Sequence, residues 1–157
     1  IIMVDAAVVH QKGIHEYLDQ YDHNNQIRLL CGSIMPAQAH QKANRLREVM
    51  RRQILDALEH VDVLIMPTSS IPASPIPARS GMGTKQEVLR GYAGRRSFTN
   101  PFNLANVPAL SVNCGFTSQD LPVGLQVIGR PFQEAMLFRV AHAYEQSTDW
   151  HTRRPPV

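Results

Sequence analysis

Two adjacent serines, Ser69 and Ser70, follow a short apolar run within residues 62–77, which read DVLIMPTSSIPASPIP. A serine becomes a nucleophile when a base takes its proton and backbone N–H groups stabilise the oxyanion. No Gly-x-Ser-x-Gly turn surrounds this pair, and the chain has only three lysines that could act as a base. The prolines account for the loop by themselves, because each fixes φ and removes a backbone donor. We therefore expect no catalytic residue here.

The remaining reactive side chains form no known cofactor motif. The chain has seven histidines but no His-Glu-x-x-His, and its two cysteines, Cys31 and Cys114, lie far apart. No phosphate-binding glycine loop occurs. We predict neither a metal nor a cofactor. Two unpaired cysteines fit a reducing, cytoplasmic location.

A second polar group lies in residues 95–103, RRSFTNPFN, just before an apolar run. Polar side chains at the mouths of strands often line a ligand cleft in α/β proteins. This placement makes Arg96, Thr99, Asn100 and Asn103 the candidate substrate-binding residues. The alternative is that the short side chains of Thr99 and the two asparagines only cap turns.

Helical elements dominate the first part of the chain. Residues 1–20 begin as an apolar strand or helix and continue as a helix, and residues 22–25 form a polar break. From Pro36 to Val61, apolar residues recur every three or four positions, which predicts one long amphipathic helix. Its arginines lie mainly off the apolar face and are interpreted as solvated surface, because no aromatic residues accompany them. A net charge of +3 adds no argument for a nucleic-acid partner.

Strands follow the long helix. Residues 63–66 are short and fully apolar, which predicts a strand buried on both faces. Residues 67–100 are predicted as one long loop on the substrate side, because four prolines interrupt the first part of it. Residues 109–116 and 123–127 alternate in polarity around a turn-rich connector and predict a hairpin. A closing amphipathic helix covers residues 136–144, and residues 151–157 form a surface tail. The fold class is therefore mixed α/β.

Three runs of sequence resemble the C-terminal part of the amidase signature enzymes. They are DVLIMPT at 62–68, FTNPFNLANVPALSVNCGF at 98–116 and LPVGLQVIGRPFQEAMLFRVAHAYE at 121–145. The resemblance implies that residues 1–157 are the C-terminal part of a single amidase domain with a mixed sheet. It also implies hydrolysis of the carbon–nitrogen bonds of amides by a Ser-Ser-Lys triad. The family's triad lies upstream in a Gly/Ser-rich stretch, which this sequence lacks.

The resemblance therefore implies scaffold and part of a substrate pocket, without catalytic residues. The expected partners are a small amide substrate, bound together with the missing N-terminal part, and a second copy of the chain. Self-association is expected because three strands of a larger sheet leave apolar faces uncovered. The chain alone is expected to be inactive and of low stability. No apolar run reaches membrane-spanning length, so no membrane partner is expected.

One position bears on the branch of the family. The glutamyl-tRNA amidotransferase enzymes of the family usually carry an acidic residue where Arg96 stands. An acid there would suit the α-ammonium group of glutamine, whereas Arg96 would repel it. The resemblance thus favours a general amidase with a neutral or anionic amide substrate. Two alternatives stay open: a non-catalytic orphan fragment that binds a partner or self-associates, and a polyproline ligand at residues 67–77.

Overall fold

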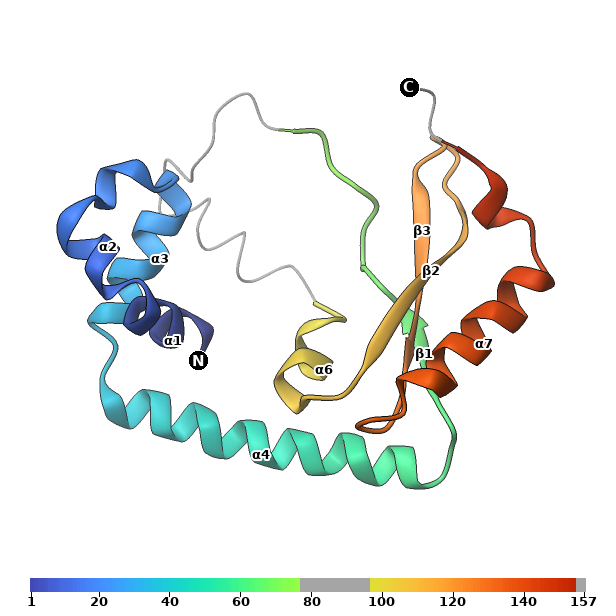
Figure 1. The fold of residues 1–157 in the computed structure, drawn as a ribbon, viewed down its shortest axis with the longest axis horizontal. Coiled ribbons are helices and arrows are strands. Elements are labelled where there is room, and N and C mark those ends of the chain that lie inside the picture. The colour runs from blue at the N-terminus through green and yellow to red at the C-terminus, as the bar shows by residue number, and fades with distance from the viewer. Residues whose placement is uncertain (77–96, 155–157) are drawn as a thin grey trace. The chain divides into compact units, whose positions relative to one another are not determined.

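The computed structural model describes residues 1–76 and 97–154 (Figure 1). Among the described residues, the chain divides into two compact units, one of residues 1–46 and 75–76 and the other of residues 47–74 and 97–154. Residues 68–76, in the first part of the predicted loop over 67–100, form neither helix nor strand. Residues 77–96 and 155–157, which belong to the predicted loop and tail, lie outside the described residues. Each unit is described by itself.

The first unit is helical. It contains α1 (Ile2–Val9), α2 (Gln11–Glu16), the 3₁₀ turn η1 (Leu18–Gln20) and α3 (His23–Ser33), and α1 packs on α3. The predicted polar break at residues 22–25 is wrong in part, because α3 begins inside it. The side chain of Asp22 accepts a hydrogen bond from the N–H of Asn24 at 3.0 Å. Asp22 is thus a helix cap, and short polar residues cluster at a helix start for that reason.

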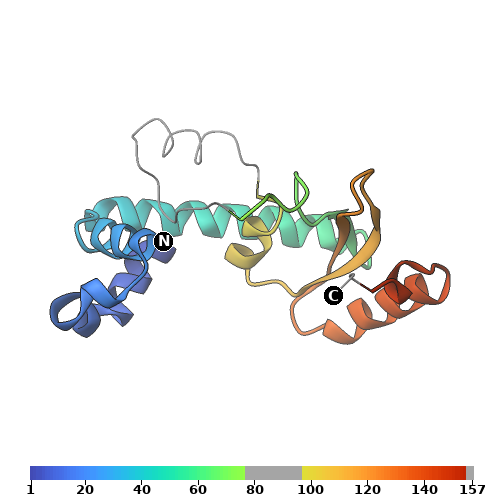
Figure 2. The ribbon, with the colours of Figure 1, turned by 90° about the horizontal axis from the view of Figure 1, so that it is seen from above.

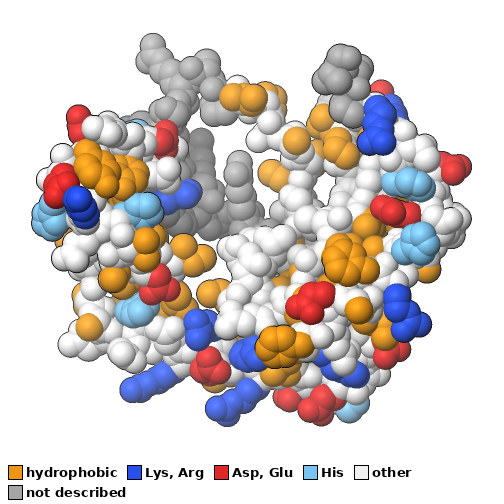
Figure 3. Space-filling view, viewed as in Figure 1, with side chains coloured by type: hydrophobic (Ala, Val, Ile, Leu, Met, Phe, Trp, Pro, Cys, Tyr) orange, Lys and Arg blue, Asp and Glu red, His pale blue; other side chains and the backbone are white. Residues whose placement is uncertain are grey.

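Helix α4 (Ala37–Glu59) is the predicted long amphipathic helix. Its apolar side supplies buried Leu58 and the partly buried Ile54 and Leu55 to the core of the second unit. Lys and Arg side chains gather along α4 at the lower edge of Figure 3. Arg51 is an exception to the predicted solvated face, because its guanidinium donates to the carbonyls of Ala105 and Asn106.

The sheet has three antiparallel strands in the order β1-β3-β2. They are β1 (Leu64–Pro67), β2 (Ala109–Phe116) and β3 (Pro122–Ile128). The predicted hairpin is confirmed as β2 and β3, although a β-bulge between Asn113 and Gly115 interrupts the predicted alternation. The prediction that the first strand is buried on both faces is wrong. β1 lies at the sheet edge, and Ile65 is 57% exposed.

Helices contact both faces of this sheet near the C-terminal end of β3, where Gln126, Val127 and Ile128 are the only buried residues of the three described strands. Ile128 packs with Leu58 of α4 and with Phe102 and Ala105 of α6 (Asn100–Ala105). The preceding residue, Val127, points to the opposite face, on which α7 (Glu134–Gln146) contacts β2 and β3. Figures 1 and 2 show α6 and α7 on opposite sides of the strands. The short turn η2 (Trp150–Thr152) follows α7.

Helix α6 begins at residue 100, the last residue of the predicted loop, and overlaps the polar group predicted at residues 95–103. Ser97 Oγ accepts a hydrogen bond from the N–H of Asn100 at 3.2 Å, and Pro101 occupies the first turn, where its missing N–H costs nothing. The helix ends at Asn106, which has a left-handed φ of 52°. Asparagine tolerates this conformation better than most residues do. Local capping therefore makes a helix of two turns or less from a sequence rich in turn formers.

Over the described residues, no helix is both long and apolar enough to cross a membrane.

Candidate functional site at the end of β1

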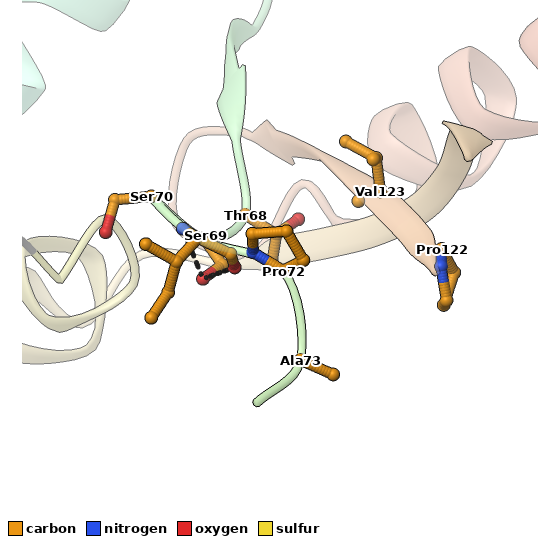
Figure 4. Close-up of a pocket in the computed structure, with 9 residues that line it drawn as sticks. Thr68, Ser69, Ser70, Pro72, Ala73, Pro122 and Val123 are labelled. Carbon is orange, nitrogen blue, oxygen red and sulfur yellow. Dashed lines mark hydrogen bonds between the residues drawn. The ribbon is translucent and has the colours of Figure 1, made fainter. Parts of the chain in front are cut away.

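A groove opens where the chain leaves β1. It has a volume of about 460 Å³ and is lined by two segments, residues 68–73 after β1 and residues 122–124 at the start of β3. Figure 4 shows Thr68, Ser69 and Pro72 on one side of the groove and Pro122 and Val123 on the other. A volume in this range suits a small organic molecule.

The sheet register brings the two segments together. The N–H of Thr68 donates to the carbonyl of Gly124 at 2.8 Å, which extends the β1–β3 pairing by one residue past Pro67. Met66 pairs with Gln126 in the same ladder, so Thr68, Gly124 and Gln126 share one face of the sheet. This is the face that packs on α4 and α6 at its other end.

A pair of hydroxyl groups lies beside the groove: Thr68 lines it, and Ser111, which is outside the lining, contacts Thr68. Thr68 Oγ1 and Ser111 Oγ are 2.5 Å apart. Ser111 belongs to the outer strand β2 and Thr68 follows the other outer strand, β1, so the contact passes over the central strand β3. Gly124 makes this contact possible. A Cβ atom there would lie 2.7 Å from Thr68 Oγ1 and 2.9 Å from Ser111 Oγ. The hydroxyl pair therefore depends on a glycine in the central strand.

Gln126 connects β3, beside the groove, to the start of α6. Its side chain is 4% exposed, and its Nε2 donates to the carbonyl of Phe98 at 3.2 Å. Gln126 lies two residues from Gly124 along β3, so both point to the same face. The segment that carries the predicted site residues is thus tied to the sheet beside the groove.

The predicted substrate-binding residues do not line this groove. Thr99, Asn100 and Asn103 lie at the start of α6, and Arg96 falls outside the described residues. The hydroxyl groups of Ser97 and Thr99 are 3.3 Å apart, and the N–H of Asn103 donates to the carbonyl of Thr99. The side chain of Thr99 makes no capping hydrogen bond at the start of α6, and the hydroxyl of Ser97 caps the helix instead. Both asparagines are exposed.

Ser69, the first of the two adjacent serines, has a local role in the loop. Ser69 Oγ donates to the carbonyl of Ile71 at 2.7 Å and accepts from the N–H of Ile71 at 3.3 Å. Dashed lines in Figure 4 mark these contacts. They close a tight turn in which the hydroxyl hydrogen is directed to the loop backbone. This geometry stiffens the loop and gives Ser69 no general base as a partner.

The described lining of the groove is electrically neutral. None of its nine residues carries a charged side chain, and five of them are apolar: Ile71, Pro72, Ala73, Pro122 and Val123. Across the described parts of the chain, no three His, Cys, Asp or Glu residues come together as a metal site. The groove can therefore hold an uncharged group by hydrogen bonds and apolar contact.

The residues that shape this groove were not predicted from the sequence as site residues. Thr68, Ser111, Gly124 and Gln126 carry a partial signal in the sequence, because Gly124 and Gln126 alternate with apolar Val123, Leu125 and Val127. That pattern marks a polar face on β3. The strand order decides which hydroxyl groups meet on this face, and no local pattern specifies it.

The chain is similar to known proteins along most of its length. A family model described as Amidase matches residues 15–138. A glutamyl-tRNA(Gln) amidotransferase subunit from Synechococcus sp. (strain JA-2-3B'a(2-13)) is 45% identical over 116 residues, which are 74% of this chain and 21% of that protein. The corresponding subunit from Chloroflexus aggregans (strain MD-66 / DSM 9485) is 47% identical over 119 residues, 75% of this chain and 23% of that protein. The chain spans about a fifth of the length of these curated relatives.

Solved structures share the fold. The 6-aminohexanoate cyclic dimer hydrolase has a TM-score of 0.80 at 23% identity, with 98% of this chain and 34% of that chain covered. A bacterial aryl acylamidase of the amidase signature family has a TM-score of 0.76 at 17% identity, with 99% and 35% covered. The mixed α/β fold predicted from the sequence is thus confirmed as a part of the amidase signature fold, about a third of the solved chains.

Proposed function

Because the chain belongs to the amidase family, whose model matches residues 15–138, we propose that it is the C-terminal portion of an amidase. In this role it supplies scaffold and one wall of the substrate pocket to an enzyme that hydrolyses carbon–nitrogen bonds of amides. The observation that carries the proposal is the neutral groove at the end of β1, which has a size suited to a small organic molecule.

The reactive groups are proposed to come from outside residues 1–157. An acyl-transfer site needs a nucleophile within hydrogen-bond reach of its base. The Ser69 hydroxyl is directed to Ile71 instead, and the ammonium group of Lys12 pairs with Glu16 at 3.8 Å. These contacts favour a supporting role for the chain and not a complete triad.

The proposed substrate is a neutral or anionic amide and not glutamine, which distinguishes this chain from the curated relatives named above. Two observations support it. Among the described residues that line the groove, none has a carboxylate that would pair with an α-ammonium group. In the sequence, Arg96 stands where the resemblance places an acidic residue in the glutamine-using branch.

The test is reconstitution. The chain is mixed with the part of the 6-aminohexanoate cyclic dimer hydrolase that it does not cover, and ammonia or amine release from a panel of simple amides is measured. We expect no activity above background from either polypeptide alone and activity from the mixture. Hydrolysis by the chain alone that Ser69→Ala or Ser70→Ala abolishes would contradict the proposal.

A second candidate is a non-catalytic module that self-associates through its sheet. The exposure of Ile65 on the edge strand β1 favours it, because an apolar edge strand invites pairing with another strand. In this role the occupant of the edge is a second copy of the chain. Reconstituted activity together with a monomeric chain would rule it out.

A further inference from the structure

We propose that the Thr68–Ser111 hydroxyl pair recognises the uncharged amide group of the substrate, so that the groove prefers a neutral amide with a small apolar acyl group over the corresponding acid. This inference rests on the proposed function and adds the substrate class and the recognising group. In this proposal Thr68 lines the groove and contacts the ligand, whereas Ser111, an exposed residue outside the lining, contacts Thr68 and acts as a positioning residue.

The hydrogen-bonding capacity of the pair is limited and directional. Each hydroxyl carries one donor and two lone pairs, and at 2.5 Å one hydroxyl must donate to the other. When Ser111 donates to Thr68, Thr68 keeps one O–H donor and one lone pair. In that arrangement Ser111 occupies one lone pair of Thr68 and restricts the directions in which the Thr68 hydrogen can point. Thr68 then offers the groove one donor and one acceptor.

A primary amide matches this set of donors and acceptors better than a carboxylate does. Its carbonyl oxygen accepts from the Thr68 O–H, and its N–H₂ group can donate to a remaining lone pair. A carboxylate only accepts, so it gains one hydrogen bond and faces unshared lone pairs. A hydrogen bond that one ligand makes and the other does not contributes about 0.5–1.5 kcal/mol, which is roughly a twofold to tenfold difference in affinity. The groove thus distinguishes the amide substrate from the acid product.

The apolar residues that line the groove give a second reason to expect an uncharged ligand. Ile71, Ala73 and Val123 are among the apolar residues that line the groove, and no described lining residue is charged. A charged ligand group entering the groove loses hydration without gaining an ion pair. Glutamine carries both an ammonium and a carboxylate group, so it fits poorly. A small branched acyl chain such as that of isobutyramide fits the apolar walls and leaves its amide for Thr68.

The test is an NMR titration of the full 157-residue chain, labelled with ¹⁵N, against isobutyramide, isobutyrate and L-glutamine. We expect isobutyramide to shift the backbone amide signals of Thr68 and Gly124 and to bind at least about twofold more tightly than the other two compounds. Thr68→Val and Ser111→Ala should each weaken isobutyramide binding by about threefold to tenfold and remove the preference over isobutyrate. The matched control is Ser118→Ala, an exposed serine in the β2–β3 connector, which should change nothing.

Each other result counts against the inference. Equal binding of isobutyramide and isobutyrate overturns it, as does an unchanged amide preference in Ser111→Ala, or no binding at all. If Thr68→Val does not fold, the inference is tested by Ser111→Ala and by the ligand preference of the unsubstituted chain. An amide preference without activity in the reconstituted mixture contradicts the proposed function and leaves the recognition intact. Activity without an amide preference contradicts the role of the hydroxyl pair alone.

Discussion

The Nε2 atom of Gln126 on β3 donates a hydrogen bond to the backbone carbonyl of Phe98 at 3.2 Å, across 28 residues of sequence. Gln126 is almost completely buried, and its neighbour on the same face, Gly124, lines the groove. This single contact ties the segment before α6 to the central strand. The contact thereby holds Phe98, which directly precedes the predicted substrate-binding residues Thr99 and Asn100, at a defined place beside the sheet.

Replacing Gln126 by alanine should therefore destabilise the second unit. The substitution leaves the Phe98 carbonyl without its partner and opens a gap on a buried strand, which together cost about 1–3 kcal/mol of the free energy of unfolding. Urea denaturation followed by circular dichroism measures this change. Gln119→Ala, at an exposed position in the β2–β3 connector, is the control and should stay within about 0.5 kcal/mol of the unsubstituted chain. Equal effects of the two substitutions would contradict a structural role for the Gln126 contact.

Gly124→Ala should separate the hydroxyl groups of Thr68 and Ser111. The new methyl group would lie 2.7 Å and 2.9 Å from the two oxygen atoms and 3.0 Å from Thr68 Cβ, so these side chains must move. Overpacking of this kind costs about 1–3 kcal/mol of the free energy of unfolding. Adding Ser111→Ala to Gly124→Ala should restore part of the loss, because one of the crowded atoms is removed. A double-mutant cycle by urea denaturation measures the coupling, and strictly additive effects would argue against the crowding.

Arg51→Met should loosen the end of α6. The guanidinium donates to the carbonyls of Ala105 and Asn106, where the C-terminus of the helix carries partial negative charge. Methionine retains much of the apolar stem but removes these charge-assisted hydrogen bonds, which contribute about 1.5–3 kcal/mol. The expected result is a lower urea midpoint and faster amide hydrogen exchange at Val107. Arg52→Met, on the exposed side of the same helix, is the matched control and should change the midpoint little.

The isolated chain should self-associate through the edge strand β1. Ile65 is 57% exposed there, and its burial against a second copy would contribute about 1 kcal/mol per chain. Ile65→Lys should therefore shift the monomer–dimer equilibrium, measured by sedimentation velocity, toward the monomer by about tenfold or more. Ile76→Lys changes an isoleucine that is 95% exposed outside the sheet and serves as the control. A chain that stays monomeric at millimolar concentration would rule out this association.

The sequence by itself predicted the elements whose signal is local. The apolar repeat between Pro36 and Val61 predicted α4, and alternating polarity predicted the hairpin of β2 and β3. Both patterns follow from the 3.6-residue period of a helix and the two-residue period of a strand. Two capping residues carry a signal that predicts something else from the sequence: Asp22 before α3 falls in the predicted polar break, and Ser97 before α6 falls in the predicted loop.

The tertiary structure alone decided which polar groups form the candidate site. Thr68 and Ser111 are 43 residues apart, and they meet because the strand order puts β3 between them and Gly124 leaves room. It also decided that β1 lies at an edge with Ile65 exposed, although the run 63–66 is fully apolar. Strand order depends on which long-range pairs bury the most surface and satisfy the most backbone groups. Local sequence specifies neither quantity, so the sequence determined the elements and the fold determined the site.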